Sequence, residues 1–391
     1  MASDAATEGL RCLKVGRLED AVRAFRRGLQ AQPDDEACLL GLARTHLAQG
    51  DAAGAEPPLR RLVQLSPEHL EAHSHLAVLQ ASAGEAAAGE RLEAIAAEPT
   101  AGFFEHYNLG HFLLERGDEA GAEAAFRAGL QRWPDNAFAL FELGRLTLRQ
   151  ERIDEAIDLL GRATKLSSDK RLPVLLLSRA HTLKGELGQA LNLVRLACKL
   201  SPDDPVPHED FYRLCMLAGD FPAAAQKAID LRLRVPGHAD YLYMHGVALL
   251  ASAEFAQARA VLEELCQQVP ESLEARRALA QACEQLEDLP AAQMLLEDVV
   301  RQAPTDVDAV NDLATLYFRM KGGAERARGI LARALAVHPE HPGLHLNHAI
   351  ALLDSDKGAA QRHASKASTS ADPEVREQAQ ELLRRLGARP S

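Results

Sequence analysis

A proline returns along this chain at an almost constant interval, and this periodicity constrains the fold more than any other feature. Most neighbouring prolines of the series are 34 residues apart, and Ser168 occupies the one vacant position. The series comprises Pro33, Pro67, Pro99, Pro134, Pro202, Pro236, Pro270, Pro304, Pro339 and Pro373. A fixed period of about 34 residues indicates a stack of helix–turn–helix units. The sequence therefore predicts an all-α solenoid of 34-residue repeats, which offers a binding surface in place of a catalytic pocket.

One unit displays the repeat motif most clearly. It contains His106-x2-Leu109-Gly110-x2-Leu113, then Gly117-Asp118, Ala122-x3-Phe126 and Pro134. This pattern resembles the tetratricopeptide repeat family, whose motif runs large-x2-Leu-Gly-x2-large, then Ala-x3-aromatic, then Pro. The resemblance implies antiparallel helix pairs that coil into a right-handed α-solenoid superhelix.

Each position of the motif has a physical reason. Small residues recur where two helices cross closely, and there large side chains are excluded. Gly-Asp and Gly-Glu pairs end one helix and begin the next, because glycine adopts the left-handed conformation and the acid faces a helix N-terminus. The small position holds Gly9, Ala43, Ala77, Gly110, Gly144, Ser178, Gly246, Ala280, Ala314 and Ala349, whereas the seventh unit departs with Tyr212.

The repeats divide the chain into two parts. We count about eleven units over residues 1–373, with irregularities at Gly84–Gly89 and Lys321–Gly323 and a degenerate eleventh unit. Residues 374–391 are expected to form a single amphipathic capping helix and a tail. Such a polar-backed terminal helix is what a solenoid needs to cover its last apolar face.

The family resemblance also predicts which side chains meet a ligand, because the first helix of each unit lines the concave face. In that register Arg145, Arg179 and Arg213 form a ladder, one per repeat. Projecting nearby are Phe104, Tyr107, Phe138, Phe141, Leu172 and Leu175. We predict a partner-binding site made of Phe104, Tyr107, His111, Phe141, Arg145, Arg149, Arg179 and Arg213.

Arginine beside exposed aromatics suits a protein or peptide partner that carries acidic and apolar groups. Eight of the 17 aromatic residues lie between Phe103 and Phe141, which supports this location. Of these, Phe126 is expected in the core, together with Phe103, Phe112 and Trp133. The alternative is an ordinary solenoid face whose arginines pair with neighbouring acids such as Glu142 or Asp210.

Charge gives a second line of argument about partners. The net charge of −12 disfavours nucleic acid as a main partner. Residues 145–199 nevertheless carry eleven Lys and Arg against six Asp and Glu, whereas residues 260–312 carry three against twelve. This asymmetry is typical of a surface that steers two differently charged partners, or two copies of the chain as a homo-oligomer. The alternative, which we prefer slightly, is that these charges belong to solvated outer helix faces.

Two known functions of the family are disfavoured by the residues. The concave position that holds asparagine in chaperone-tail carboxylate clamps holds none here, and the lysine one turn earlier is also absent. An asparagine ladder of the kind found in glycosyltransferase arms is reduced to Asn108 and Asn347.

No sequence motif supports catalysis or a cofactor. The chain lacks HExxH, GxSxG, P-loop and GxGxxG patterns, so we predict a protein that is not an enzyme and binds no cofactor. His341, His345 and His348 follow a helical i, i+4, i+7 course, which metal sites also use. Because His345 and His348 fall on positions that pack between helices, we predict a structural role and no metal.

The sequence also suggests where and how the protein acts. It begins without a basic start and a long apolar run, and no stretch reaches the ~20 apolar residues of a membrane span. A cytoplasmic location is therefore expected. The favoured hypothesis is a non-catalytic scaffold that captures another protein. A regulatory sensor that closes on a peptide or small ligand, and a non-catalytic adaptor arm of a separate enzyme, remain alternatives.

Overall fold

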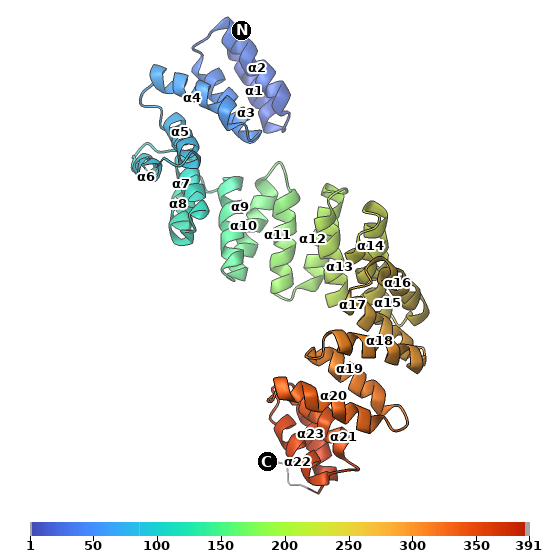
Figure 1. Ribbon diagram of the computed structural model, residues 1–391. Helices are drawn as coiled ribbons and strands as arrows, with labels where there is room; N and C mark the ends of the chain where they lie inside the picture. Colours follow the sequence, from blue (N-terminus) through green and yellow to red (C-terminus); the bar gives the residue numbers. More distant parts are fainter. Residues whose placement is uncertain (1, 86, 388–391) are drawn as a thin grey trace. The chain divides into compact units, whose positions relative to one another are not determined.

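A computed structural model describes residues 2–85 and 87–387 of the chain, and these residues fold into 23 α-helices without a strand (Figure 1). The first helices of the pairs are α1 (Ala2–Lys14), α3 (Glu36–Ala48), α5 (Leu70–Ser82), α7 (Phe103–Glu115), α9 (Ala137–Arg149), α11 (Arg171–Leu183), α13 (Pro205–Leu217), α15 (Ala239–Ala251), α17 (Leu273–Gln285), α19 (Val307–Phe318) and α21 (Pro342–Leu352). The second helices are α2 (Leu18–Ala31), α4 (Ala52–Leu65), α6 (Ala88–Ala97), α8 (Glu119–Arg132), α10 (Ile153–Leu166), α12 (Leu187–Leu200), α14 (Phe221–Arg234), α16 (Phe255–Gln268), α18 (Leu289–Gln302), α20 (Gly323–Val337) and α22 (Lys357–Ala367). A single helix, α23 (Pro373–Arg385), follows the last pair. The predicted all-α solenoid class is confirmed.

The chain separates into two compact units. One unit ends at Pro207 and the other begins at His208, and each is described by itself. Within each unit a helix contacts mainly the helices one or two places away in the sequence. The predicted division into a solenoid of residues 1–373 and a capping segment remains a prediction. Its tail, residues 388–391, lies outside the described residues.

The turns inside the pairs follow from glycine and aspartate. Gly117 has a φ of 81° and ends α7, and the Asp118 side chain then accepts a hydrogen bond of 2.9 Å from the backbone N–H of Gly121. Asp51 and Asp220 cap α4 and α14 in the same way. These caps satisfy N–H groups that the first helical turn leaves unpaired.

Three turns adopt the left-handed conformation without glycine. Glu151, Ala253 and Glu287 have φ values of 61°, 60° and 60° at the positions where other repeats place glycine. A side chain there is strained by contact with the backbone, at a cost of about 1 kcal/mol for each residue. The repeat geometry thus fixes the turn even where its residue is unfavourable.

The core of each pair lies where a small residue meets a large one. A β-carbon at Gly110 would lie 2.6 Å from Cε1 of Phe126, so the buried ring requires glycine at this point. Gly246 is equally close to the side chain of Leu262. These contacts explain the recurring small position of the motif, since the helices approach only where no side chain intervenes.

The structure is irregular at the three places where the sequence departs from the repeat. The third pair has a second helix, α6, of only 10 residues, which begins after the turn at Gly84. Near Lys321–Gly323, α19 ends at Phe318 and Gly322 takes a φ of 74° before α20. In the last pair both helices are shortened to 11 residues. α23 then buries Ala379, Leu382 and Leu383 against α21 and α22.

Candidate functional site

The first helices of the first unit carry seven of the eight predicted site residues. α7, α9 and α11 position them at equivalent places of successive repeats, and α9 contacts α11 directly. We call the solvent-facing side of these three helices the α7–α11 face. It comprises His111, Phe138, Arg145, Arg149, Leu172 and Arg179.

Two apolar side chains of this face are open to solvent. Phe138, in the first turn of α9, is 66% exposed, and Leu172, at the same place of α11, is 61% exposed. Phe138 has a neighbour in Tyr107, with ring centroids 6.4 Å apart in an edge-on arrangement. Large apolar side chains at equivalent places of two adjacent helices make a row available for contact with a partner.

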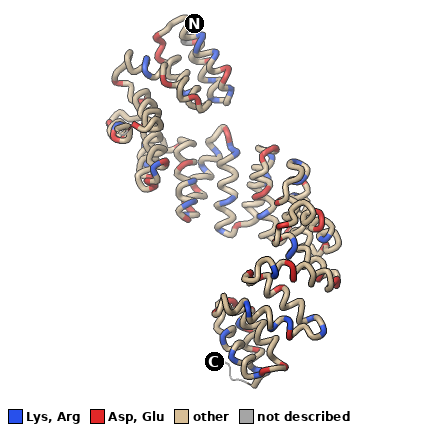
Figure 2. The backbone as a smooth tube through the Cα atoms, viewed as in Figure 1, with Lys and Arg blue, Asp and Glu red and all other residues tan. Residues whose placement is uncertain are grey.

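A cationic row lies two helical turns from the apolar row. Arg145 is seven residues after Phe138 and Arg179 is seven residues after Leu172, a separation of about 10 Å along the helix axis. His111 holds the same position on α7, and Arg149 adds a guanidinium one turn beyond Arg145. In Figure 2 Lys and Arg are interspersed with Asp and Glu along these helices.

The arginines of this face have acidic neighbours. Arg145 pairs with Glu142 at 2.6 Å on α9, and Arg149 pairs with Glu119 of α8 at 2.7 Å. The Arg145 side chain remains 43% exposed in its pair. Glu142 itself is buried, whereas the side chains of Arg149 and Glu119 are both exposed, and such an exposed pair contributes only about 0–1 kcal/mol to stability because water screens both charges. The pairing anticipated as the alternative to partner binding is therefore present, but it leaves the guanidiniums within reach of a ligand.

Other predicted site residues serve packing as well. Tyr107 packs beside Phe103 and Phe126 with ring centroids 5.5 and 6.0 Å apart, and burial raises the pKa of its hydroxyl to about 12. Phe141 is half-buried against the apolar clusters on both sides of α9. Both therefore form the floor of the face.

Phe104 belongs to a polar network between the second, third and fourth pairs. The guanidinium of Arg44 lies 4.5 Å from the centre of its ring and donates two hydrogen bonds of 2.6 Å to Glu71. Burial raises the pKa of Glu71, but its hydrogen bond to His75 and the charge of Arg44 outweigh this, so the pKa is lowered overall. Phe104 thus stabilises the contact between pairs, a role that its position in the motif does not reveal.

Arg213 lies in the second unit and is described there. It pairs with Asp210 at 3.0 Å and with Glu209 at 3.3 Å on its own helix, α13. Of the three arginines of the predicted ladder, Arg145 and Arg179 lie in the first unit and Arg213 lies in the second. The full site therefore stays a prediction.

The prediction that Trp133 lies in the core is wrong. Trp133 is 37% exposed, whereas Phe112 and Phe126 are buried as expected and Phe103 is half-buried. The tryptophan follows α8 directly as its C-terminal cap, where the chain turns, and its ring lies 5.6 Å from the guanidinium of Arg132. The motif specifies the small and aromatic positions inside the helix but not the residue that ends it.

The three histidines predicted to follow one side of a helix, His341, His345 and His348, lie on or next to α21, and the first two have structural roles. The His341 ring accepts a hydrogen bond from the Leu344 backbone N–H and caps α21. His345 is buried; its Nε2 lies 2.8 Å from the carbonyl oxygen of Pro339 and its Nδ1 lies 2.7 Å from Nδ1 of His363 on α22. Across the described residues, no group of three or more His, Cys, Asp or Glu side chains is arranged to hold a metal ion.

This histidine cluster makes the stability of the last pair depend on pH. Burial and the neighbouring charges of His348 and His345 lower the pKa of His363 from 6.5 to about 4. A lowered pKa in the folded state means that the unfolded chain binds more protons between pH 4 and 6.5. The contribution to stability is thus complete above pH 6.5 and is lost as the pH falls toward 4.

We therefore expect His363→Asn, which keeps a short polar group but cannot take up a proton, to flatten the pH dependence of unfolding. The difference between wild type and variant should change by on the order of 1–2 kcal/mol across this window, since part of the ring is exposed. Urea unfolding followed by circular dichroism at several pH values measures it. Parallel profiles for the two proteins would contradict the expectation, and His111→Asn, at a half-buried histidine of the other unit, is the control.

Comparison with known proteins defines the class of the chain. A family model described as tetratricopeptide repeat matches residues 7–69, 40–102, 107–170, 141–205 and 218–270, and a second with the same description matches residues 249–317. The chain belongs to the tetratricopeptide repeat family. Repeats of this family are scaffolds for protein–protein interaction, so the fold implies protein partners.

Particular relatives are larger proteins. Cellulose synthase 2 operon protein C of Komagataeibacter xylinus is 29% identical over 282 residues, which cover 66% of this chain and 21% of that protein. Cellulose synthase operon protein C of Pseudomonas fluorescens is 24% identical over 395 residues, which cover 97% of this chain and 27% of that protein. The chain spans about a quarter of the length of these relatives.

A solved structure supports the fold. The C-terminal part of a TPR repeat-containing protein from Cytophaga hutchinsonii aligns with a TM-score of 0.53 at 14% identity, covering 62% of this chain and 98% of that one. This likeness concerns the fold alone. Within the part of the chain that the structure describes, every helix is too short or too polar to cross a membrane.

Proposed function

We propose that the α7–α11 face binds an extended segment of another protein in which apolar and acidic residues alternate. The observation that carries the proposal is the pair of parallel rows, Phe138 and Leu172 on one side and Arg145 and Arg179 on the other. An extended chain directs successive side chains to opposite sides. Lying across the helices between the rows, it brings its apolar side chains to one row and its carboxylates to the other.

The energetics of both rows favour such a ligand. Covering an exposed Phe or Leu side chain removes apolar surface from water, and full burial is worth about 1.5–3 kcal/mol. A ligand carboxylate can approach the Arg145 guanidinium from the solvent side, because that side chain is 43% exposed, while the buried Glu142 keeps its existing pair. In this role the chain is a non-catalytic scaffold.

The apolar row can be tested with a defined probe, a fluorescein-labelled synthetic peptide in which leucine and glutamate alternate. We expect Phe138→Ser/Leu172→Ser to weaken peptide binding about tenfold or more in fluorescence anisotropy, because both side chains lose their contact with the peptide. The fold should be unaffected, since both side chains are exposed.

A matched control comes from two leucines with the same spacing on the second helices. Leu166 and Leu200 are exposed on α10 and α12, 34 residues apart like the test pair. Leu166→Ser/Leu200→Ser should bind the peptide as wild type does. Equal binding by the Phe138→Ser/Leu172→Ser variant would exclude the apolar row from the site.

A second candidate function is the non-catalytic arm of a separate enzyme. It is favoured by the similarity to proteins named for the cellulose synthase operon, which cover 97% of the chain in one case. The scaffold would bind a segment of any partner protein, whereas the arm would bind an enzyme; both would use the α7–α11 face. If the arm is the correct role, an enzymatic activity should copurify with wild-type protein and be absent from the Phe138→Ser/Leu172→Ser preparation.

A further inference from the structure

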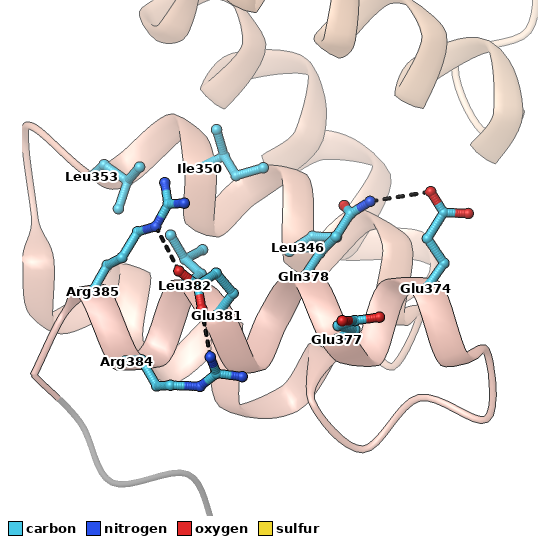
Figure 3. Close-up of a pocket in the computed structure, with 10 residues that line it drawn as sticks. All are labelled: Leu346, Ile350, Leu353, Glu374, Glu377, Gln378, Glu381, Leu382, Arg384 and Arg385. Carbon is cyan, nitrogen blue, oxygen red and sulfur yellow. Dashed lines mark hydrogen bonds and ion pairs between the residues drawn. The ribbon is translucent and has the colours of Figure 1, made fainter.

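The second unit contains an open groove between α21 and α23 (Figure 3). Its volume is about 710 Å³. The floor is apolar and is formed by Leu346 and Ile350 of α21, by Leu353 directly after that helix, and by Leu382 of α23. Leu346 and Leu382 are buried in the core of the last pair, whereas Ile350 and Leu353 are half-buried and reach the surface.

The rim of the groove is charged and has two different ends. At one end Arg384 and Arg385 both contact Glu381, at 2.7 and 3.1 Å, so their charges are partly compensated. At the other end lie Glu374 and Glu377, as Figure 3 shows. Glu374 accepts a hydrogen bond of 3.2 Å from Gln378, and neither Glu374 nor Glu377 has a cationic partner among residues 2–85 and 87–387.

The floor has the spacing of a helix stripe. Leu346 and Ile350 of α21 and its C-cap residue Leu353, which keeps helical backbone angles, stand at i, i+4 and i+7 and cover about 10 Å along the helix axis. A row of this kind packs well against a second helix with the same stripe, because side-chain ridges fit the grooves between them. Amphipathic helices bind hydrophobic grooves in this manner, with anchors at i, i+3 or i+4, and i+7.

Charge decides the chemistry of the occupant. The two carboxylates without cationic partners at one rim attract lysine or arginine on the flank of an incoming helix and repel acidic residues there. We propose that the α21–α23 groove binds a cationic amphipathic helix of a partner protein. This site lies in the second unit and requires the opposite charge from the ligand proposed for the α7–α11 face, so the two sites discriminate between partners.

The test uses the full-length protein and two synthetic peptides labelled with fluorescein. Both carry leucines at i, i+4 and i+7; one has lysines along one flank and the other has glutamates at the same places. In fluorescence anisotropy the lysine peptide should bind at least about tenfold more tightly than the glutamate peptide. Equal affinity of the two peptides, or no binding of either, would overturn the proposal.

A charge reversal at the rim locates the site. Glu374→Lys/Glu377→Lys should weaken the lysine peptide about tenfold and strengthen the glutamate peptide. Because both residues are exposed, circular dichroism should show unchanged helix content. Glu254→Lys/Glu271→Lys is the matched control, with the same change in net charge at exposed positions of the same unit outside the groove.

Two further measurements separate the proposal from its competitors. Sedimentation of the free protein tests whether a second copy of the chain occupies the groove. Concentration-dependent dimers that disappear in Glu374→Lys/Glu377→Lys would make that copy the occupant and overturn the proposal of a partner helix. The Arg145→Glu/Arg179→Glu variant should bind the lysine peptide normally. Loss of that binding would place the peptide on the α7–α11 face and overturn the groove assignment, whereas failure of the leucine–glutamate peptide alone would affect only the proposed function.

Discussion

Reversing the charge of Arg145 and Arg179 together should abolish binding of the leucine–glutamate peptide to the α7–α11 face. Each guanidinium makes charge-assisted hydrogen bonds with a ligand carboxylate, and each such bond contributes about 1.5–3 kcal/mol. Glutamate at both positions replaces this attraction by repulsion. We therefore expect the Arg145→Glu/Arg179→Glu variant to bind at least about a hundredfold more weakly in fluorescence anisotropy.

The control for this experiment reverses two positive charges with the same spacing on the second helices of the same pairs. Lys165 and Lys199 are exposed on α10 and α12 and stand 34 residues apart, as Arg145 and Arg179 do. Lys165→Glu/Lys199→Glu changes the net charge equally, so it should alter binding only through long-range attraction, which salt screens. Retained binding in the arginine variant, or an equal loss in the lysine variant, would remove this face from consideration.

The second large effect concerns stability, and it arises at Phe126. This ring is 1% exposed and fills the space beneath Gly110, between α7 and α8. Phe126→Ala leaves a cavity that the rigid helix pair fills only in part, so it should lower the free energy of unfolding by about 3–5 kcal/mol. Urea unfolding followed by circular dichroism measures the change.

Phe138→Ala is the matched control for Phe126→Ala. It removes the same type of side chain from α9, the first helix of the next pair, at a position that is largely exposed. Substitutions at such surface positions usually change stability by no more than about 0.5 kcal/mol. If both variants unfold at the same urea concentration, the glycine–aromatic contact is not what holds the pair together.

The fold was predictable because each repeat must satisfy the same local requirements. Gly117 and Asp118 follow from the need to reverse the chain and cap a helix, and the phenylalanine at 126 follows from the glycine that faces it. These requirements act within one pair, so they leave a periodic pattern in the sequence. Even the irregular third pair is visible as a shortened interval.

The site was less predictable because exposure depends on neighbouring repeats. Tyr107 and Phe141 share a face with Phe138 in a helical projection, yet the adjacent pairs partly cover the first two and leave the third exposed. The contact of Arg44 with Phe104 joins the second and fourth pairs, so no single repeat encodes it. The groove depends on how α23 packs against α21, which the period of the repeat does not specify.

The restriction of helix contacts to near neighbours in the sequence bears on how the protein is made. Within the part of the chain that the structure describes, the main helix contacts join helices one or two places apart, so a helix leaving the ribosome finds its partners among the helices made just before and just after it. Each unit can therefore assemble during synthesis, from its amino end onward, with short loops to close and rapid folding.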